Sequence, residues 1–197
     1  MNNSNLGTCV AVPRCYTGLP RRNLHFGPEK PPRSLNPNFR VLLVMTDRLN
    51  YLAASPRGMQ AFGGVHLYLE KSGLPSTLVN LVYLRVSQIN GCTYCISSHS
   101  ADLLKEGTPV PKLLLLQAWR ESGALYSDRE RAALQWAEAI TLIADTHAPD
   151  ADYQVARAQF DDKELADLTY AIGLINAYNR IAIGFGRGPD PAFVSGG

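Results

Sequence analysis

Two cysteines and a histidine stand close together near the middle of the chain, between Gln88 and His99. Cys92 and Cys95 have the C-x-x-C spacing of redox-active dithiols, and His99 follows four residues after the second cysteine. On a helix, residues four apart lie side by side, so a histidine at this position can accept a thiol proton. Cys92 lies one turn back, within reach to form a disulfide with an oxidised Cys95. The three residues therefore predict a redox dithiol with its own base.

The local sequence indicates a helix that begins at the dithiol. Asn90 and Gly91 interrupt the chain, because glycine adopts backbone angles that other residues avoid. The stretch 92–106 contains no proline or glycine, and Gly107 after it is a typical end signal. The free amides at a helix N-terminus favour a thiolate at Cys92. We nevertheless expect the lower pKa at Cys95, because a protonated His99 would compensate its charge more strongly.

Other chemistries fit these residues less well. A structural zinc site would use the two cysteines and His99, but such sites need four ligands. The remaining cysteines, Cys9 and Cys15, lie in a distant segment, and there is no second C-x-x-C. A static disulfide would close a loop too short to restrain the unfolded chain, and two inert buried cysteines stay open as an alternative. We therefore predict no metal.

The composition is that of one globular domain, with 197 residues of which 46% are hydrophobic and 18% are charged. No apolar run reaches the length of a membrane span, and no signal peptide is recognisable, so we expect a cytoplasmic protein that does not bind membranes. In that compartment a C-x-x-C is more often catalytic than structural. The net charge of +2 combines +5 in residues 1–44 with −3 in the remainder, so nucleic acid is not an expected partner.

The first 44 residues differ in composition from the rest. Six of the thirteen prolines lie in residues 1–40, and no periodic apolar pattern accompanies them. Such a segment is typical of irregular structure. We interpret 1–44 as a basic arm, disordered or an extension outside the native protein, followed by a domain over 45–193 and a tail over 194–197.

Residues 45–193 show helical periodicity throughout, with capping signals and no alternating strand pattern, so the predicted class is an all-α helical bundle. The last helix is apolar nearly all round, apart from Asn176, Asn179 and Arg180. Such a helix lies in the centre of a bundle or in a subunit interface, and both remain open. The seven expected helical segments cover residues 55–73, 75–90, 92–106, 113–119, 127–143, 150–160 and 161–183.

The order of these elements resembles the AhpD-like alkylhydroperoxidase family within the carboxymuconolactone decarboxylase superfamily. The resemblance covers residues 45–193 and is carried first by Leu84-Arg85-Val86-Ser87-Gln88-Ile89-Asn90-Gly91-Cys92-Thr93-Tyr94-Cys95 with His99. Three further stretches agree in order and spacing: Ala118-Trp119-Arg120-Glu121-Ser122, Glu130-Arg131-Ala132-Ala133-Leu134 and Ile175-Asn176-Ala177-Tyr178-Asn179-Arg180.

The resemblance implies a small all-helical subunit that assembles into homotrimers or homohexamers and reduces hydroperoxides. It implies a redox-active disulfide between Cys92 and Cys95, reduced by a lipoyl-bearing adaptor protein or another dithiol, with no bound metal, flavin or haem. By the family's pattern, Cys95 is the peroxidatic thiol, Cys92 the resolving thiol and His99 the base.

Two positions depart from the family's pattern. The family has a glutamate twelve residues before the first cysteine, where this chain has Asn80. An amide cannot shuttle protons as a carboxylate does, so a weaker proton relay is implied. Tyr94 stands where some members have a second histidine. Asp102, three residues after His99, is a candidate to orient the imidazole instead, although such a residue also commonly faces solvent.

Three functions are therefore distinguished. The first is a thiol-dependent hydroperoxide reductase in antioxidant defence. The second is a non-enzymatic sensor or holdase whose surface changes when the dithiol oxidises. The third, decarboxylation of a lactone acid, needs no C-x-x-C and finds no basic cluster in the sequence to hold a dicarboxylate.

Overall fold

The computed structural model describes residues 48–195 of the chain. Within these residues the chain forms helices and no strands, which confirms the predicted all-α class. The predicted arm at 1–44 lies outside the described residues, as do the last two residues of the predicted tail. The helices in chain order are α1 (Tyr51–Ala54), α2 (Pro56–Glu70), α3 (Ser76–Asn90), α4 (Thr93–Lys105), α5 (Val110–Leu114), η2 (Leu116–Glu121), η3 (Gly123–Leu125), α6 (Asp128–Thr141), α7 (Ile143–Thr146), α8 (Asp150–Arg157), α9 (Asp162–Gly184) and α10 (Pro191–Val194).

The predicted segments correspond to the longer helices, and their ends follow the local signals. α6 begins at a capping box in which Ser127 and Glu130 each bond the other's backbone amide. α9 begins at a second capping box, formed by Asp161 and Glu164. The short helices α1, α7 and α10 were not predicted, because four residues carry too little periodicity to be recognised.

The predicted helix over 113–119 is wrong in its detail. The chain forms the short α5 and then the 3₁₀ helix η2, with non-helical backbone angles at Ala118. Leu116 and Trp119 are both buried in one apolar cluster. In a 3₁₀ helix, residues three apart lie directly above each other, so this winding places both side chains on the core side.

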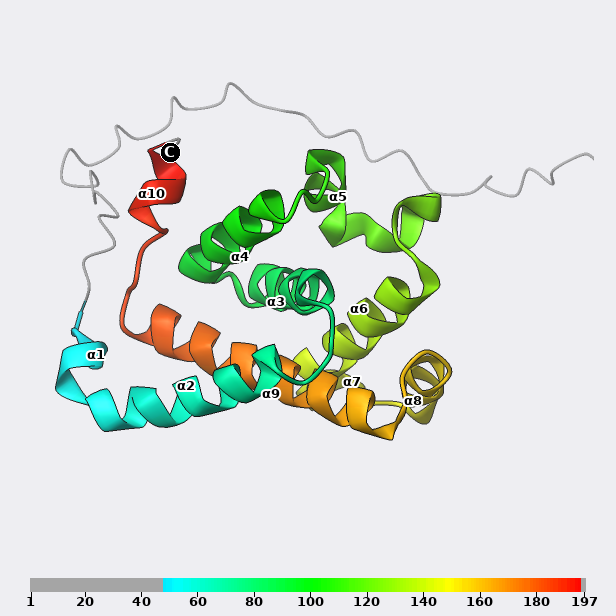
Figure 1. The fold of residues 1–197 in the computed structure, drawn as a ribbon, viewed down its shortest axis with the longest axis horizontal. Helices are drawn as coiled ribbons and strands as arrows, with labels where there is room; N and C mark the ends of the chain where they lie inside the picture. The colour runs from blue at the N-terminus through cyan, green and yellow to red at the C-terminus, as the bar shows by residue number, and fades with distance from the viewer. Residues whose placement is uncertain (1–47, 196–197) are drawn as a thin grey trace, which may run out of the picture. The chain divides into compact units, whose positions relative to one another are not determined.

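α3 lies at the centre of the helical unit and packs against α4, α6 and α9 (Figure 1). Its buried face includes Leu81, Val82, Leu84 and Val86. The dithiol follows directly after the C-terminal end of this central helix, at the start of α4, so both cysteines lie in the interior rather than on a loop at the surface.

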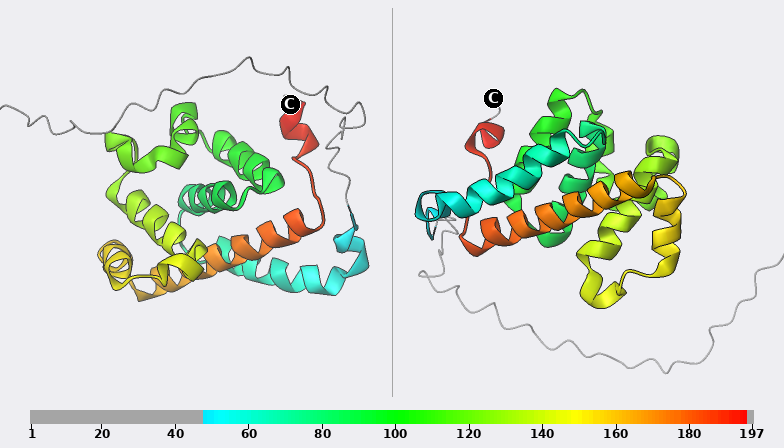
Figure 2. Two further views of the ribbon diagram at one scale, coloured as in Figure 1. Left: turned by 180° about the vertical axis from the view of Figure 1, so that it is seen from behind. Right: turned by 60° about the horizontal axis from the view of Figure 1, so that its bottom comes forward.

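α9 runs beside α2, as the two further views in Figure 2 make clear. The Tyr68 hydroxyl of α2 donates to the buried Asp167 of α9 over 2.8 Å, and the rings of Phe62 and Tyr178 pack with centroids 5.7 Å apart. One side of α9 is buried, yet Tyr170 is 58% exposed. A groove of about 710 Å³, with mostly apolar lining, lies between α2 and α9.

None of the helices within residues 48–195 combines the length and the apolar character that a membrane span requires.

Candidate active site: a buried dithiol at the start of α4

The dithiol lies where the chain turns from α3 into α4. α3 ends in a Schellman motif: Gly91 has a φ of 71°, and the amide of Cys92 donates to the carbonyl of Ser87 over 3.0 Å. Cys92 is then the N-cap of α4, and its Sγ accepts the amide N–H of Cys95 at 3.4 Å. The two Sγ atoms lie 2.6 Å apart, and both cysteines are buried free thiols. The predicted chain break and the predicted start of the helix are therefore present.

The acidity of the two thiols is the reverse of the expected order. The hydrogen bond from the Cys95 thiol lowers the pKa of Cys92 to about 7 against the opposing effect of burial, and backbone amides of the first turn of α4 add to the lowering. The same hydrogen bond, together with burial and the charge of Cys92, raises the pKa of Cys95. The helix N-terminus therefore favours negative charge on Cys92.

His99 does not supply the expected positive charge. Burial, and secondly the proximity of His66, lower the pKa of His99 to about 4, so the ring is neutral near pH 7. The His99 ring packs on Tyr83 with centroids 4.9 Å apart, and its Nδ1 lies 3.2 Å from Oδ1 of Asn80. His99 is thus placed to accept a proton, rather than to pair with a thiolate as a cation.

The structure brings Asn80 to His99, as expected for the position of the family's glutamate. It does not bring Asp102 there. The Asp102 carboxylate is 45% exposed and lies 3.9 Å from Lys105 Nζ. Among the described residues, the hydrogen-bond partner of the His99 ring is Asn80 on α3. Asp102 is therefore not the orienting group, because the imidazole bonds Asn80 on α3, and the alternative that Asp102 faces solvent is the one that the structure confirms.

A buried polar network underlies the two thiols. Asn179 of α9 is fully buried; its amide donates to Ser87 Oγ over 3.0 Å, and its Oδ1 accepts from Asn90 at 2.9 Å. Its side chain also hydrogen-bonds both thiols and favours their charged forms. Because an unpaired amide in the core is costly, these bonds fix α9 against the end of α3.

Arg187 is a residue of the site that the sequence reasoning missed. α9 ends in a second Schellman motif, in which Gly186 has a φ of 72° and the Arg187 amide donates to the Ala182 carbonyl at 2.9 Å. The Arg187 guanidinium lies 3.6 Å from the centroid of the Tyr94 ring and donates to the Tyr51 hydroxyl over 2.9 Å. Its charge opposes the rise in the pKa of Cys95. The glycine after an apolar helix marks the turn in the sequence, but nothing there connects it with the dithiol.

Cys95, His99 and Arg187 open into one cavity of about 280 Å³. Neighbouring segments hold its walls together: the amide of Asp190 donates to Ser97 Oγ at 2.9 Å, and the Tyr51 and Phe185 rings stack at 5.3 Å. The remaining lining consists largely of aromatic and apolar side chains: Tyr51, Met59, His66, Tyr94, Ser98, Ile175, Tyr178 and Ala182.

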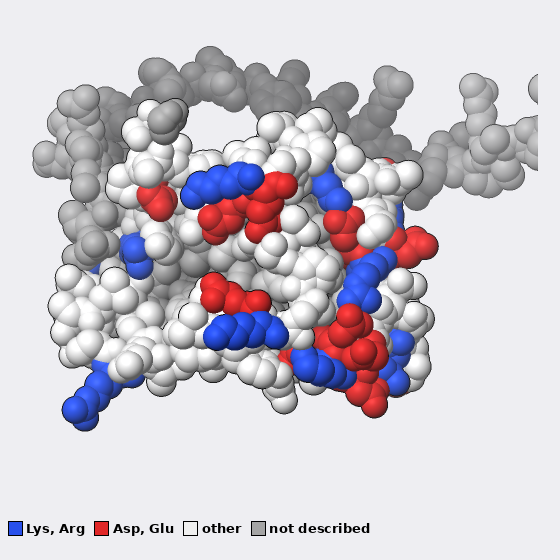
Figure 3. Space-filling model, in the orientation of Figure 1, with Lys and Arg blue, Asp and Glu red and all other residues white. Residues whose placement is uncertain are grey.

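A second cleft, of about 470 Å³, adjoins this cavity and shares His66 with it. It lies between the C-terminal ends of α2 and α4, and its lining includes Glu70, Asn80, Tyr83 and Glu106. Figure 3 shows acidic side chains gathered on two sides of a hollow on this face. The dithiol cavity is therefore mostly apolar, whereas the adjoining cleft is acidic.

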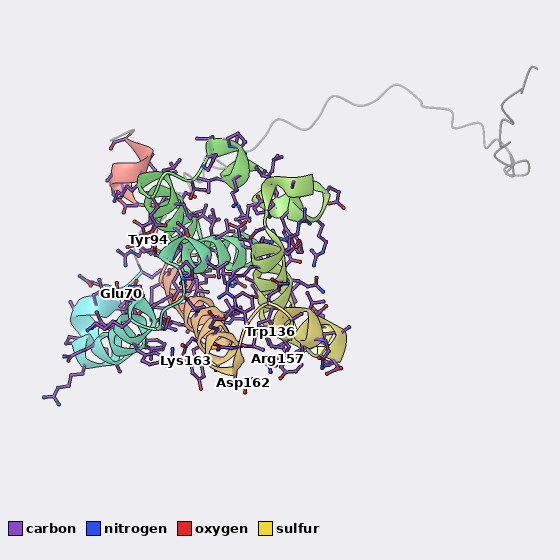
Figure 4. All side chains as sticks on the ribbon, turned by 45° about the vertical axis from the view of Figure 1, so that its right-hand side comes forward. Glu70, Tyr94, Trp136, Arg157, Asp162 and Lys163 are labelled. Carbon is purple, nitrogen blue, oxygen red and sulfur yellow. The ribbon has the colours of Figure 1, made fainter. Side chains whose placement is uncertain are left out.

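A wider hollow of about 740 Å³ lies at the turn between α8 and α9, lined by residues 157–163. Figure 4 shows Arg157, Asp162 and Lys163 in a part of the molecule away from Tyr94 and the dithiol helix. It contains the Arg157–Asp162 ion pair and no cysteine or histidine. We therefore place the candidate active site at the dithiol. Within residues 48–195, no group of three or more His, Cys, Asp or Glu side chains is arranged to hold a metal ion.

Known proteins resemble this chain in sequence and in fold. Residues 53–139 match the model of the carboxymuconolactone decarboxylase family. The uncharacterized protein YdfG of Bacillus subtilis (strain 168) is 37% identical over 143 residues, which cover 73% of this chain and 97% of YdfG. A structure from Agrobacterium tumefaciens, described as a candidate antioxidant defence protein AhpD, is 40% identical to this chain, with a TM-score of 0.71. The match covers 74% of this chain and 99% of the Agrobacterium chain. The structure of an uncharacterized peroxidase-related protein from Silicibacter sp. TM1040 is 25% identical, with a TM-score of 0.64. The match covers 73% of this chain and 78% of the Silicibacter chain. The chain therefore belongs to the carboxymuconolactone decarboxylase family, among its AhpD-like members.

Proposed function

We propose that this protein is a dithiol peroxidase that reduces organic hydroperoxides in antioxidant defence. The observation that carries the proposal is the pair of buried free thiols with Sγ atoms 2.6 Å apart, of which Cys95 opens into a cavity shared with His99 and Arg187. The descriptions of two relatives, one as an antioxidant defence protein and one as peroxidase-related, support the same activity.

The ionisation of the thiol pair supplies the nucleophile. With the pKa of Cys92 lowered to about 7, the pair loses one proton near neutral pH, and the two sulfur atoms, 2.6 Å apart, share a hydrogen bond through the proton that remains. When that proton moves to Cys92, the charge resides on Cys95, which is the sulfur that lines the cavity. Cys95 therefore attacks the peroxide and Cys92 resolves the product, although Cys92 holds the charge at rest.

His99 and Arg187 take different parts in this step. The neutral His99 ring accepts the proton that the dithiol releases, whereas Arg187 keeps a permanent positive charge at the cavity wall. The Tyr94 ring and the Tyr51 hydroxyl hold the guanidinium in place. Arg187 thus provides the compensating charge that the sequence reasoning gave to His99.

The proposed reaction is balanced in atoms and electrons. The Cys95 thiolate attacks the distal peroxide oxygen; an S–O bond forms, the O–O bond breaks, and the leaving alkoxide takes the proton from His99. Cys92 then attacks the sulfur of the Cys95 sulfenic acid, and the disulfide forms with loss of water. A lipoyl-bearing adaptor or another dithiol reduces the disulfide by thiol exchange and is itself oxidised. The aromatic walls at Tyr94 and Tyr178 favour a hydroperoxide with an apolar organic group.

The test is consumption of an organic hydroperoxide by the purified protein with dihydrolipoamide as the reductant. We expect repeated turnover by the wild type and none by Cys95→Ser. The Cys92→Ser variant should stop after one attack and retain a sulfenic acid on Cys95, which mass spectrometry detects. A wild-type protein that oxidises once and does not turn over would favour the sensor or holdase instead. Sulfenic acid on Cys92 with Cys95 still reduced would overturn the division of roles.

A further inference from the structure

We propose that Glu106 fixes the tautomer of His99 by acting through the amide of Asn80. In this arrangement Nδ1 of His99 always carries the ring proton, and Nε2 is always free to accept a proton from the dithiol. The proposal rests on the proposed function, because it concerns the base of that reaction. Asn80 bridges the two residues: its Oδ1 lies 3.2 Å from His99 Nδ1, and its Nδ2 donates to Glu106 Oε1 over 3.3 Å.

Asn80 alone would not select a tautomer. A neutral imidazole has one donor and one acceptor nitrogen, and a side-chain amide has a donor end and an acceptor end. The amide of Asn80 can therefore bond His99 in either of two orientations, each with a different tautomer. An additional partner of the amide is needed to make one orientation more stable than the other.

Glu106 is such a partner, because an ionised carboxylate accepts hydrogen bonds and donates none. It requires the NH₂ group of Asn80 to face it, and the carbonyl oxygen of Asn80 must then face His99. An oxygen in that position requires a proton on Nδ1. The lone pair of Nε2 is then left at the opposite edge of the His99 ring. The His99 side chain lines the same cavity as Cys95.

The place of Glu106 in the helix strengthens this reading. Glu106 is the C-cap of α4, directly before Gly107 with a φ of 83°. A carboxylate at a helix C-terminus is disfavoured by the helix dipole, so helix stability does not explain a glutamate there. The bond to Asn80 gives the residue a role that accounts for its position.

The ring of His99 is surrounded by groups from several helices. The other titratable and charged side chains that line the two adjoining cavities around it come from five elements and the chain after α9: Tyr51 on α1, His66 and Glu70 on α2, Tyr83 on α3, Tyr94, Cys95 and Asp102 on α4 with Glu106 at its C-cap, Tyr178 on α9, and Arg187. Among the described residues, Asn80 is the hydrogen-bond partner of the His99 ring. The contact between Nδ1 and Asn80 Oδ1 is therefore the one that sets the tautomer.

The experiment is nitrogen NMR of the reduced protein with ¹⁵N-labelled histidine, since the two tautomers have distinct ring-nitrogen shifts. We expect His99 of the wild type to show a single tautomer with the proton on Nδ1. Glu106→Ala should give a mixture of both tautomers and slow peroxide reduction about two- to tenfold, the order of one long, solvent-exposed hydrogen bond to a carboxylate. The matched control is Asp102→Ala, which removes a carboxylate from the same end of α4 and should leave the single tautomer unchanged.

A second variant tests the logic without depending on Glu106. Asn80→Asp places an acceptor-only group at His99, so Asn80→Asp combined with Glu106→Ala should restore the single Nδ1–H tautomer. The proposal is overturned if Glu106→Ala keeps a single tautomer, or if Asp102→Ala mixes the tautomers equally. The NMR readout needs no turnover. A wild type that consumes no peroxide but shows the predicted tautomers would therefore reject the proposed function and leave this inference standing.

Discussion

The reduced protein should become more stable between about pH 6 and pH 8, and Cys92 should cause much of the gain. The folded state lowers the pKa of Cys92 from its ordinary 9.0 to about 7. An acidic group with a depressed folded-state pKa adds stability that is fully present above its unfolded pKa and is lost as the pH falls through the folded value. For Cys92 this contribution is complete above about pH 9, has fallen to about half by pH 8 and is almost gone at pH 6, one unit below the folded pKa.

The magnitude follows from the two pKa values. Between one pH unit below the folded pKa and one unit above it, the ionisation of Cys92 should raise the free energy of unfolding by roughly 1 to 2 kcal/mol. Cys95, whose pKa is raised, stays protonated in the folded and unfolded states over most of this range and contributes little. His99 adds about 1 kcal/mol or less, because its folded pKa of about 4 lies below the ordinary 6.5 and stability is lost as the pH falls below 6.5.

The assay is urea unfolding in the presence of a phosphine reductant at a series of pH values, for the wild type and for Cys92→Ser. The wild type should gain roughly 2 kcal/mol and the variant roughly 1 kcal/mol, the remainder that His99 supplies. Alkylation of the reduced wild type followed by peptide mapping identifies the ionised sulfur. Two results together would refute the order of acidity in the structure: an equal gain in the free energy of unfolding for both proteins, and alkylation of Cys95 with a midpoint near pH 7. They would restore the order expected from sequence.

Three further changes test other parts of the site and the assembly. Arg187→Gln removes the cavity's permanent cation and should slow peroxide reduction near neutral pH up to about tenfold, with recovery at higher pH in a pH–rate profile; an unchanged profile would exclude the role of Arg187. Asn179→Ala removes one of the two hydrogen-bond acceptors of the Asn90 amide and the donor to Ser87 Oγ, and it should reduce the free energy of unfolding by about 2 to 4 kcal/mol in urea; a loss below 1 kcal/mol would contradict the network. The apolar groove between α2 and α9 should be an interface in a homotrimer or homohexamer. Gly173→Glu, where an added Cβ atom meets no other atom within 4 Å, should lower the oligomer mass by light scattering without unfolding the subunit, and a wild type that is already monomeric would reject the interface.

Much of the helical order was predictable from sequence, because it is set by contacts within one turn of each residue. Gly91 alone permits the left-handed turn between α3 and α4, and this turn makes Cys92 an N-cap. The capping boxes at Ser127 and Asp161 similarly determine where α6 and α9 begin. The local sequence pattern did not predict the 3₁₀ helix η2. Its winding follows from the burial of Leu116 and Trp119 in one apolar cluster.

The electrostatics of the site depended on the tertiary structure, because they depend on which groups lose their contact with water. The spacing of Cys95 and His99 correctly places the two residues on one cavity, but only the packing of Tyr83 and the neighbouring helices makes the ring neutral. Arg187 is distant in sequence and reaches the dithiol because α9 crosses the end of α3 and its last turn is closed by Gly186. The sequence by itself therefore determined where the thiols lie and what they can become. The fold decided which sulfur carries the charge and which group compensates it, because burial and long-range contacts set the relative energies of charged forms.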